Sequence, residues 1–124
     1  MEKRVTQEQI ERYAEAAGDF NPIHIDHEFA ATTQFDGTIA HGMLIAAFLS
    51  EMLTHTFHGD WLESGRLKIR FKAPVLPGDQ ITAFGRVKSV SEKEGASQVT
   101  CAVGVRKQDG EAAITGDATV VISR

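Results

Sequence analysis

The sequence predicts an α+β fold in which an antiparallel sheet curls around one buried helix. Before about residue 60 the apolar residues recur at helical spacing, and after it they alternate with polar ones. Residues 42–53, GMLIAAFLSEML, are apolar on nearly every side of a helix, which indicates burial on every side. The 124 residues show no linker or internal repeat, so we expect one domain spanning residues 1–124.

Two helices are expected before this central helix. The first begins after Thr6, where Gln9 completes the pattern of a capping box, and Gly18 stands at the position of a C-terminal cap. Asp26 is a candidate N-cap for a second, shorter helix. The apolar positions of these two helices are Ile10, Tyr13, Ala14, Ala17, Phe29 and Ala30.

Four strands are expected after the central helix. In residues 66–72, RLKIRFK, the alternation turns Leu67, Ile69 and Phe71 inward and the basic residues toward solvent. The inward positions of the later strands are Ile81, Ala83 and Val87, then Val99, Cys101, Val103 and Val105, and finally Ala118, Val120 and Ile122. Turn residues at 77–79 and at Asp109-Gly110 separate these strands, and short turns favour antiparallel pairing.

The composition restricts the function and the compartment. The net charge of −4 does not favour a nucleic-acid-binding protein. Cys101 is the single cysteine, so no disulfide can form within the chain, which fits a reducing compartment. The N-terminal residues lack the apolar run of a signal peptide, and residues 43–49 are too few to span a bilayer. We therefore expect a cytoplasmic protein.

The stretch GDFNPIH, residues 18–24, is the first candidate for chemistry. Asp19 and His24 follow a helix end, and Pro22 restricts the backbone between them and pushes Asn21 toward an extended conformation. A carboxylate and an imidazole held close together can divide the roles of base and acid. Spacing alone slightly favours the alternative, a polar turn with a structural histidine.

The second candidate is His41-Gly42, directly before the central helix. The first N–H groups of a helix lack intrahelical partners and carry partial positive charge, and a glycine leaves room for a ligand to approach. The Gly42 N–H is therefore a candidate donor to a carbonyl oxygen that gains negative charge. Close packing would also explain a glycine at this position.

Taken together, these segments resemble a known family. Residues 13–44 are similar to the hydratase motif of (R)-specific enoyl-CoA hydratases and MaoC-like dehydratases, in which GDxNPxH is followed by HGM before the central helix. Residues 70–81, RFKAPVLPGDQI, resemble the strand and turn of the same family. The chain matches the motif at Gly18, Asp19, Asn21, Pro22, His24, His41, Gly42 and Met43.

The resemblance implies a hot dog fold and reversible, (R)-specific hydration of trans-2-enoyl-CoA to (R)-3-hydroxyacyl-CoA, a reaction of fatty-acid metabolism. Asp19 and His24 would be the catalytic pair, Asn21 would support them, and the backbone N–H of Gly42 would bind the thioester oxygen. No metal or other cofactor is implied, because coenzyme A is part of the substrate. The family also implies a homodimer or higher homo-oligomer, with no nucleic-acid or membrane partner.

By the same resemblance, Ser50 and Leu53 would line the acyl pocket for a short- to medium-chain substrate. The two residues lie three apart on one helical face. A plain core position is the alternative for Leu53.

Several alternatives remain at this point. A metal site built from His24, Asp26, His27 and His41 matches no established zinc spacing. The basic residues 66, 68, 70 and 72 form either a solvated strand face or a contact for coenzyme A phosphates or an acidic carrier protein. The rival functions are a (3R)-hydroxyacyl-acyl-carrier-protein dehydratase, a hot dog thioesterase and a non-catalytic acyl-CoA-binding protein.

Overall fold

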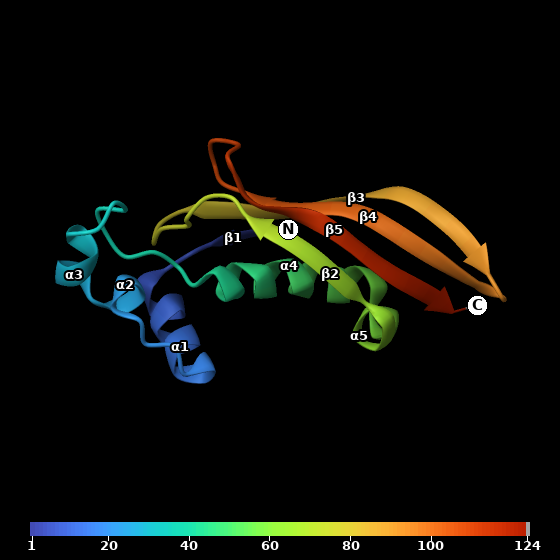
Figure 1. Ribbon diagram of the computed structural model, residues 1–124, viewed down its shortest axis with the longest axis horizontal. Helices are drawn as coiled ribbons and strands as arrows, with labels where there is room; N and C mark the ends of the chain where they lie inside the picture. Colours follow the sequence, from blue (N-terminus) through green and yellow to red (C-terminus); the bar gives the residue numbers. More distant parts are fainter. Residues whose placement is uncertain (124) are drawn as a thin grey trace.

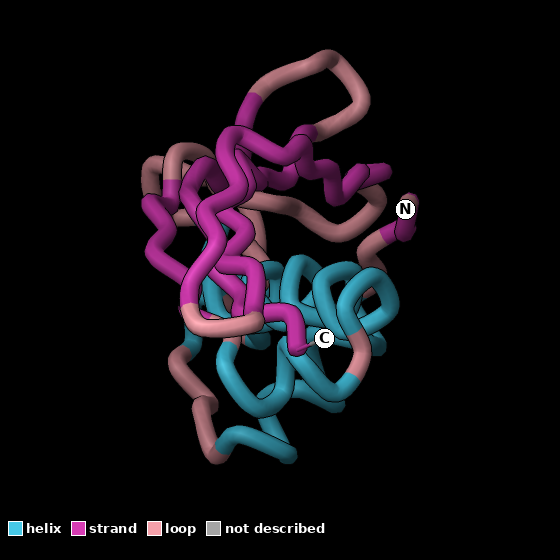
Figure 2. Tube along the Cα trace, turned by 90° about the vertical axis from the view of Figure 1, so that its right-hand side faces the viewer, coloured by secondary structure: helices cyan, strands magenta, loops and turns pink. Residues whose placement is uncertain are grey.

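The computed structural model describes residues 1–123 and arranges them in two layers, with helices packed against one face of a sheet (Figure 1). Figure 2 shows the strands and the helices on opposite sides of the molecule. The strands are β1 (Glu2–Arg4), β2 (Arg66–Phe71), β3 (Gln80–Lys93), β4 (Ala96–Arg106) and β5 (Ala112–Ser123). The helices are α1 (Gln7–Ala17), α2 (Pro22–Ile25), α3 (His27–Ala31), α4 (Gly42–Phe57) and α5 (Gly59–Ser64).

The sheet is antiparallel with the strand order β1-β3-β4-β5-β2, which confirms the predicted pairing. β2 does not pair with β3, the next strand along the chain, but with β5, where Arg66 lies opposite Thr119. β2 is therefore an edge of the sheet. β1 forms the other edge, with Lys3 opposite Ile81, and this short strand was not predicted from the sequence.

The helix caps formed as predicted. Thr6 and Gln9 make the reciprocal hydrogen bonds of a capping box at the start of α1, and Gly18 ends that helix with a φ of 71°. Asp26 accepts a hydrogen bond from the Phe29 N–H at the start of α3, at 3.1 Å. These caps depend on residues within three or four positions of each other, which is why the sequence predicts them.

Two short helices, α2 and α5, were not predicted. The segment between Asp19 and His24 was expected to be a loop, yet residues 22–25 form one helical turn. Asn21 itself is extended, with φ −55° and ψ 128°, and its side chain caps the turn at the Ile23 N–H. Pro22 occupies the first helical position, where its fixed φ and missing N–H are favourable.

Helix α4 lies beneath the sheet and supplies much of the core (Figure 1). Its buried side consists of Ile45, Ala46, Phe48, Leu49 and Leu53. The expectation that α4 is buried on every side is wrong for the single chain, because Met43 is 61% exposed and Ala47 is exposed. The sheet covers one side of this helix, and Met43 and Ala47 lie on the side that it leaves open.

Two strand residues that were expected inside the core are exposed. Phe71, at the end of edge strand β2, is 55% exposed, and Val87 in β3 is 57% exposed. Val87 borders a bulge between residues 87 and 89, in a hairpin that extends past the end of α4 in Figure 1. Alternation predicts the face toward which a side chain points, but it does not predict how far the helix covers that face.

A largely buried ion pair connects the turn before β3 to the β4–β5 hairpin. The Asp79 carboxylate lies 3.1 Å from the Lys107 ammonium and accepts hydrogen bonds from the Leu76 N–H and the Gln108 amide. Lys107 also donates to the Pro74 carbonyl at 3.0 Å. These contacts fix residues 74–76, which run beside the start of α4.

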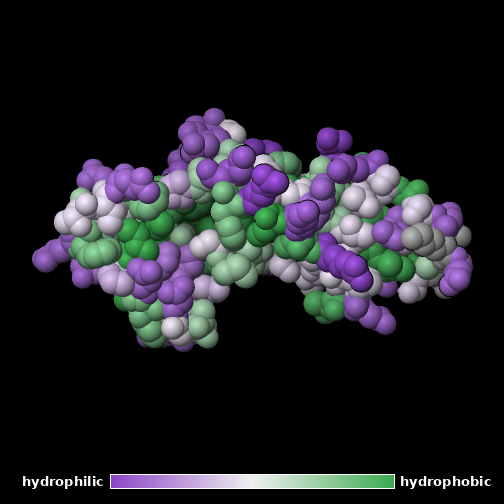
Figure 3. Space-filling model, in the orientation of Figure 1, coloured by the Kyte–Doolittle hydropathy of each residue, from purple (hydrophilic) through white to green (hydrophobic). Residues whose placement is uncertain are grey.

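Among the described helices, none has the length and apolar character needed to cross a lipid bilayer. The face of the molecule in Figure 3 is mixed, with apolar side chains showing between charged ones along its length.

Candidate active site

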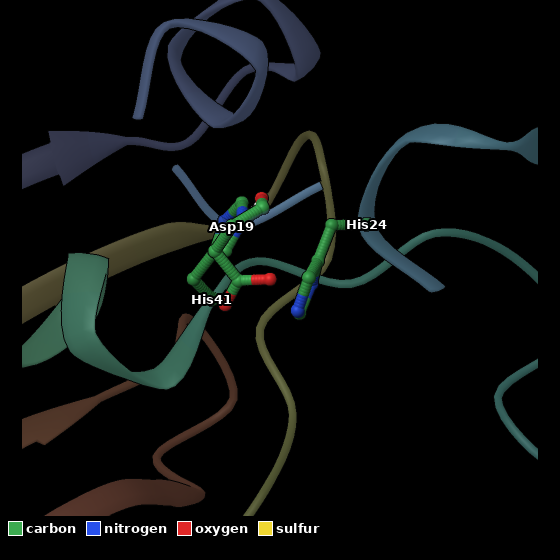
Figure 4. A group of neighbouring side chains, drawn as sticks. All are labelled: Asp19, His24 and His41. Carbon is green, nitrogen blue, oxygen red and sulfur yellow. Dashed lines mark hydrogen bonds between the residues drawn. The ribbon is translucent and has the colours of Figure 1, made fainter. Parts of the chain in front are cut away.

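Three polar side chains from separate elements converge beside the start of α4 (Figure 4). Asp19 follows α1, His24 belongs to α2, and His41 is the N-cap of α4. One side-chain oxygen or nitrogen atom of each residue lies within 4.8 Å of the others. The structure thus brings the Asp19–His24 pair proposed from the sequence together with a second histidine.

Asp19 is exposed, and both its backbone N–H and its backbone carbonyl are hydrogen-bonded. Its N–H donates to the Ala14 carbonyl at 3.1 Å, and its own carbonyl accepts a hydrogen bond from the His41 Nε2 at 3.0 Å. One carboxylate oxygen, Oδ1, accepts from the Asn21 backbone N–H at 3.2 Å. Asn21 therefore orients Asp19 through its main chain, while its side chain caps α2. The second carboxylate oxygen accepts no hydrogen bond from the residues that the structure describes.

His24 is half-buried, and its ring has a defined orientation. The Nδ1 atom lies 2.8 Å from the Ile39 carbonyl oxygen, and because a carbonyl only accepts, Nδ1 carries the proton of this bond. Nε2 is the ring nitrogen that remains for chemistry. A histidine with one nitrogen fixed on a backbone carbonyl has the orientation expected of a general acid or base.

His41 contacts both members of the pair and is only 2% exposed. Its ring stacks on the His24 ring with centroids 3.8 Å apart, and the Tyr13 ring lies against it at 4.9 Å. Its Nε2 donates to Asp19, while Nδ1 is buried without a hydrogen-bond partner among the described residues. From the sequence, His41 was a position of the family motif, the neighbour of Gly42 and a conceivable metal ligand. Its ring was given no role, because nothing local shows that it reaches Asp19 and His24.

Gly42 begins α4 and lines an apolar pocket of about 290 Å³. Within the described part of the chain, nothing accepts a hydrogen bond from its N–H, as expected at the first helical position. A Cβ at this position would lie 2.9 Å from the Phe71 ring, so only glycine fits without moving that ring. The other side chains around the pocket include Phe35, Ile39, Ile45, Val75 and Ile114.

Ser50 and Leu53 lie deeper along α4. Ser50 lies eight positions after Gly42 in the helix, which is about 12 Å at the helical rise. Ser50 accepts a hydrogen bond from the Trp61 indole N–H at 3.4 Å, and Leu53 is 2% exposed in the core. In the single chain neither residue lines the pocket at Gly42. Their role toward an acyl chain stays a prediction.

The stacked histidines are poorly placed to share a metal ion. Lone pairs of imidazole lie in the plane of the ring, and the His24 and His41 planes are inclined by only 23° at a centroid separation of 3.8 Å. A metal at the usual distance of about 2 Å from one ring nitrogen would therefore lie well outside the plane of the other ring. Asp26 and His27, considered with them as ligands, do not belong to the cluster.

Comparisons with known proteins point to one family. Residues 1–109 match the protein family described as MaoC like domain. The chain is 35% identical over 120 residues to an (R)-specific enoyl-CoA hydratase of Aeromonas caviae, an alignment that covers 97% of this chain and 88% of that protein. It is 36% identical to the enzyme of the same name from Rhodospirillum rubrum, covering 97% of this chain and 81% of that one.

Solved structures agree with these sequence matches. The solved structure of an (R)-hydratase from Aeromonas caviae involved in PHA biosynthesis superposes with a TM-score of 0.84 at 33% identity. It covers 100% of this chain and 92% of the other. The similarity therefore includes the sheet, the central helix and the segment that carries the polar cluster.

Proposed function

Because this chain belongs to the MaoC-like family, we propose that it catalyses the reversible, (R)-specific hydration of trans-2-enoyl-CoA to (R)-3-hydroxyacyl-CoA, with short to medium acyl chains. The observation that carries the proposal is the position of Asp19 and His24 beside the start of α4, where the Gly42 N–H has no partner among the described residues. This arrangement offers a base, an acid and a hydrogen-bond donor for one reaction.

The proposed reaction begins with water bound between Asp19 and His24. Asp19 accepts a proton as the water oxygen forms a bond to C3, and the electrons of the double bond move through C2 onto the thioester oxygen. The Gly42 N–H stabilises the charge on that oxygen, a contribution of about 3 kcal/mol for a donor of this type. His24 Nε2 delivers a proton to C2, and a proton passes from Asp19 to His24 to restore the pair.

The fixed Nδ1 of His24 supports this assignment of roles. Since Nδ1 donates to the Ile39 carbonyl, only Nε2 is available to exchange a proton with the substrate. The steps transfer water and protons alone, so we propose that the enzyme uses no metal and no redox cofactor.

A homodimer and a cytoplasmic location complete the proposal. The exposed Phe71 at the end of edge strand β2 and the exposed Met43 on α4 form apolar surface that a second copy would cover. Light scattering on the purified protein tests the oligomeric state. The location rests on the lone cysteine, Cys101, which is buried and unpaired.

The decisive experiment follows the conjugated enoyl absorbance after the enzyme is added to trans-2-enoyl-CoAs of increasing chain length. We expect rapid loss of absorbance with short substrates and an (R) product by chiral chromatography. Asp19→Asn and His24→Gln should each lower kcat by roughly 10²–10⁴-fold. A folded protein that turns over no enoyl thioester would overturn the proposal, and a strong preference for the carrier-protein thioester would favour the dehydratase of fatty-acid synthesis.

A further inference from the structure

Helix α2, which carries His24, cannot hold its own position. It comprises only residues 22–25, and none of them is buried. A single helical turn has no independent stability in water, because the nucleus of a helix is costly and needs packing or further turns to compensate. The placement of the His24 ring must therefore come from contacts outside the helix.

The segment at residues 38–39 supplies part of this support. The Ile39 N–H donates to the Ile23 carbonyl at 3.2 Å, and the Ile39 carbonyl accepts from the His24 Nδ1 at 2.8 Å. These two bonds hold one side of the turn and fix the direction of the imidazole ring.

A second support reaches His24 from α1. The Gln7 side-chain amide donates to the His24 carbonyl at 2.9 Å, and its oxygen accepts a hydrogen bond from the Thr38 hydroxyl at 2.8 Å. Thr38 is 4% exposed, which makes its hydroxyl one of the few buried polar groups of the chain. A buried hydroxyl without a partner costs about 1–3 kcal/mol, so the bond to Gln7 will be strongly retained.

The His24 carbonyl determines which way the Gln7 amide points. A glutamine amide can rotate by half a turn and exchange its oxygen for its NH₂ group. Because the His24 carbonyl only accepts, the NH₂ group faces His24, and the amide oxygen faces the Thr38 hydroxyl, which donates to it. Without the Thr38 hydroxyl the amide would be held at one end only, and its bond to the His24 carbonyl would lose this support.

We propose that Thr38 and Gln7 are positioning residues that hold His24 at its reactive distance from Asp19 without touching the substrate. The inference rests on the hydratase function proposed above. Displacing a reacting group by about 1 Å can cost a hundredfold in rate, so a support outside the site can control kcat while leaving substrate binding intact.

Matched variants test this proposal. Thr38→Val removes the hydroxyl at nearly constant volume, and Thr38→Ser keeps it. Gln7→Glu keeps an acceptor for Thr38 but places an oxygen against the His24 carbonyl. We expect Thr38→Val and Gln7→Glu each to lower kcat by about tenfold with KM unchanged, while Thr38→Ser stays within about twofold of the parent enzyme.

A double variant and a control make the test sharper. Because the two residues act through one contact, Thr38→Val combined with Gln7→Glu should be no worse than the poorer single variant. Thr56→Val, which removes a hydroxyl that bonds the Met52 carbonyl near the end of α4, should leave kcat unchanged. Equal losses in Thr38→Val and Thr38→Ser, or losses that multiply in the double variant, would overturn the proposal.

An NMR measurement separates this inference from the function on which it rests. The Nδ1 proton of His24, held by the Ile39 carbonyl, should give a downfield signal in the parent protein. We expect the signal to shift or broaden in Thr38→Val and Gln7→Glu and to persist in Thr38→Ser. An unchanged signal in Thr38→Val contradicts the positioning role even if no enoyl thioester is turned over, whereas an inactive parent protein contradicts the hydratase function alone.

Discussion

The imidazole ring of His41 lies against that of His24, with the ring centroids 3.8 Å apart. The same residue donates to the Asp19 carbonyl, so one buried side chain contacts both groups of the proposed catalytic pair. It also occupies the N-cap of α4 without making a side-chain capping bond. We interpret His41 as a residue that helps to position Asp19 and His24 and that contributes no capping bond to the stability of α4.

Replacing His41 should separate activity from stability. Asparagine is a preferred N-cap, and it can satisfy an α4 N–H that histidine leaves unpaired, which is worth about 1 kcal/mol. We therefore expect His41→Asn to unfold at a higher temperature than His41→Ala, while both lose at least tenfold in kcat because the stack on His24 is gone. Thermal unfolding and steady-state kinetics provide the two measurements. Full activity in His41→Ala would show that the stack has no catalytic importance.

A side chain at residue 42 should impair the site more than the fold. The added Cβ of Gly42→Ala would lie 2.9 Å from the Phe71 ring, and Phe71 is exposed enough to move aside. We expect a loss of stability of no more than about 1 kcal/mol, together with a clear drop in kcat/KM, because the methyl group enters the pocket beside the proposed oxyanion donor. Combining Gly42→Ala with Phe71→Ala should recover stability but not activity. Recovery of both would assign the defect to packing alone.

The stability of the protein should depend on pH through Asp79. Burial by itself raises the pKa of this carboxyl, but the Leu76 N–H, the Gln108 amide and the Lys107 ammonium together outweigh it, so the pKa lies below its ordinary value of 3.8. A lowered pKa in the folded state adds stability above the pKa of the unfolded chain, and this stability is lost as pH falls through the folded value. Unfolding by urea at a series of acidic pH values should show this decline.

Substitutions supply the control for that measurement. Asp79→Asn should lower the free energy of unfolding near neutral pH by about 2–3 kcal/mol and flatten its dependence on acidic pH, because Lys107 loses its buried partner. Asp117→Asn removes the exposed pair with Lys88 and should cost no more than about 1 kcal/mol. Equal effects of the two substitutions would contradict the importance of burial.

The selectivity for acyl chains can be tested on two buried leucines of α4. Leu53→Ala and Leu49→Ala each delete a core side chain and should each cost about 2–5 kcal/mol of stability. If Leu53 limits the acyl pocket, only Leu53→Ala should also raise turnover of longer enoyl-CoAs relative to short ones. The ratio of kcat/KM values for the two chain lengths is the measurement. Equal ratios in the two variants would leave Leu53 as a core residue.

Local features of the fold were predictable, and distant pairings were not. The caps at Thr6 and Asp26 depend on neighbours three residues away, so they are readable from the sequence. Edge strand β1 has three residues, and its structure depends on pairing with β3 almost eighty positions later, which has no local signal. The pairing of β2 with β5 could not be predicted from the sequence for the same reason.

The candidate site divides in a similar way. Asp19, His24 and Gly42 were recognised because their motif is compact and resembles a known family. Gln7 and Thr38 stand thirty-one positions apart and meet only after α1 and the segment before α4 have packed together. The alternating pattern predicted that Phe71 faces the core, but Phe71 lies at the edge of the sheet and is exposed beside Gly42.

The brevity of α2 has a consequence for protein engineering. Its four residues carry the histidine of the proposed reaction, and their position depends on groups contributed by α1 and by residues 38–39. If the motif GDFNPIH were grafted onto another scaffold, the residues would be present but would lack the contacts that position them. The smallest transferable unit therefore runs from Gln7 to Gly42, so a designer who wants the proposed chemistry must transplant more than a quarter of the molecule.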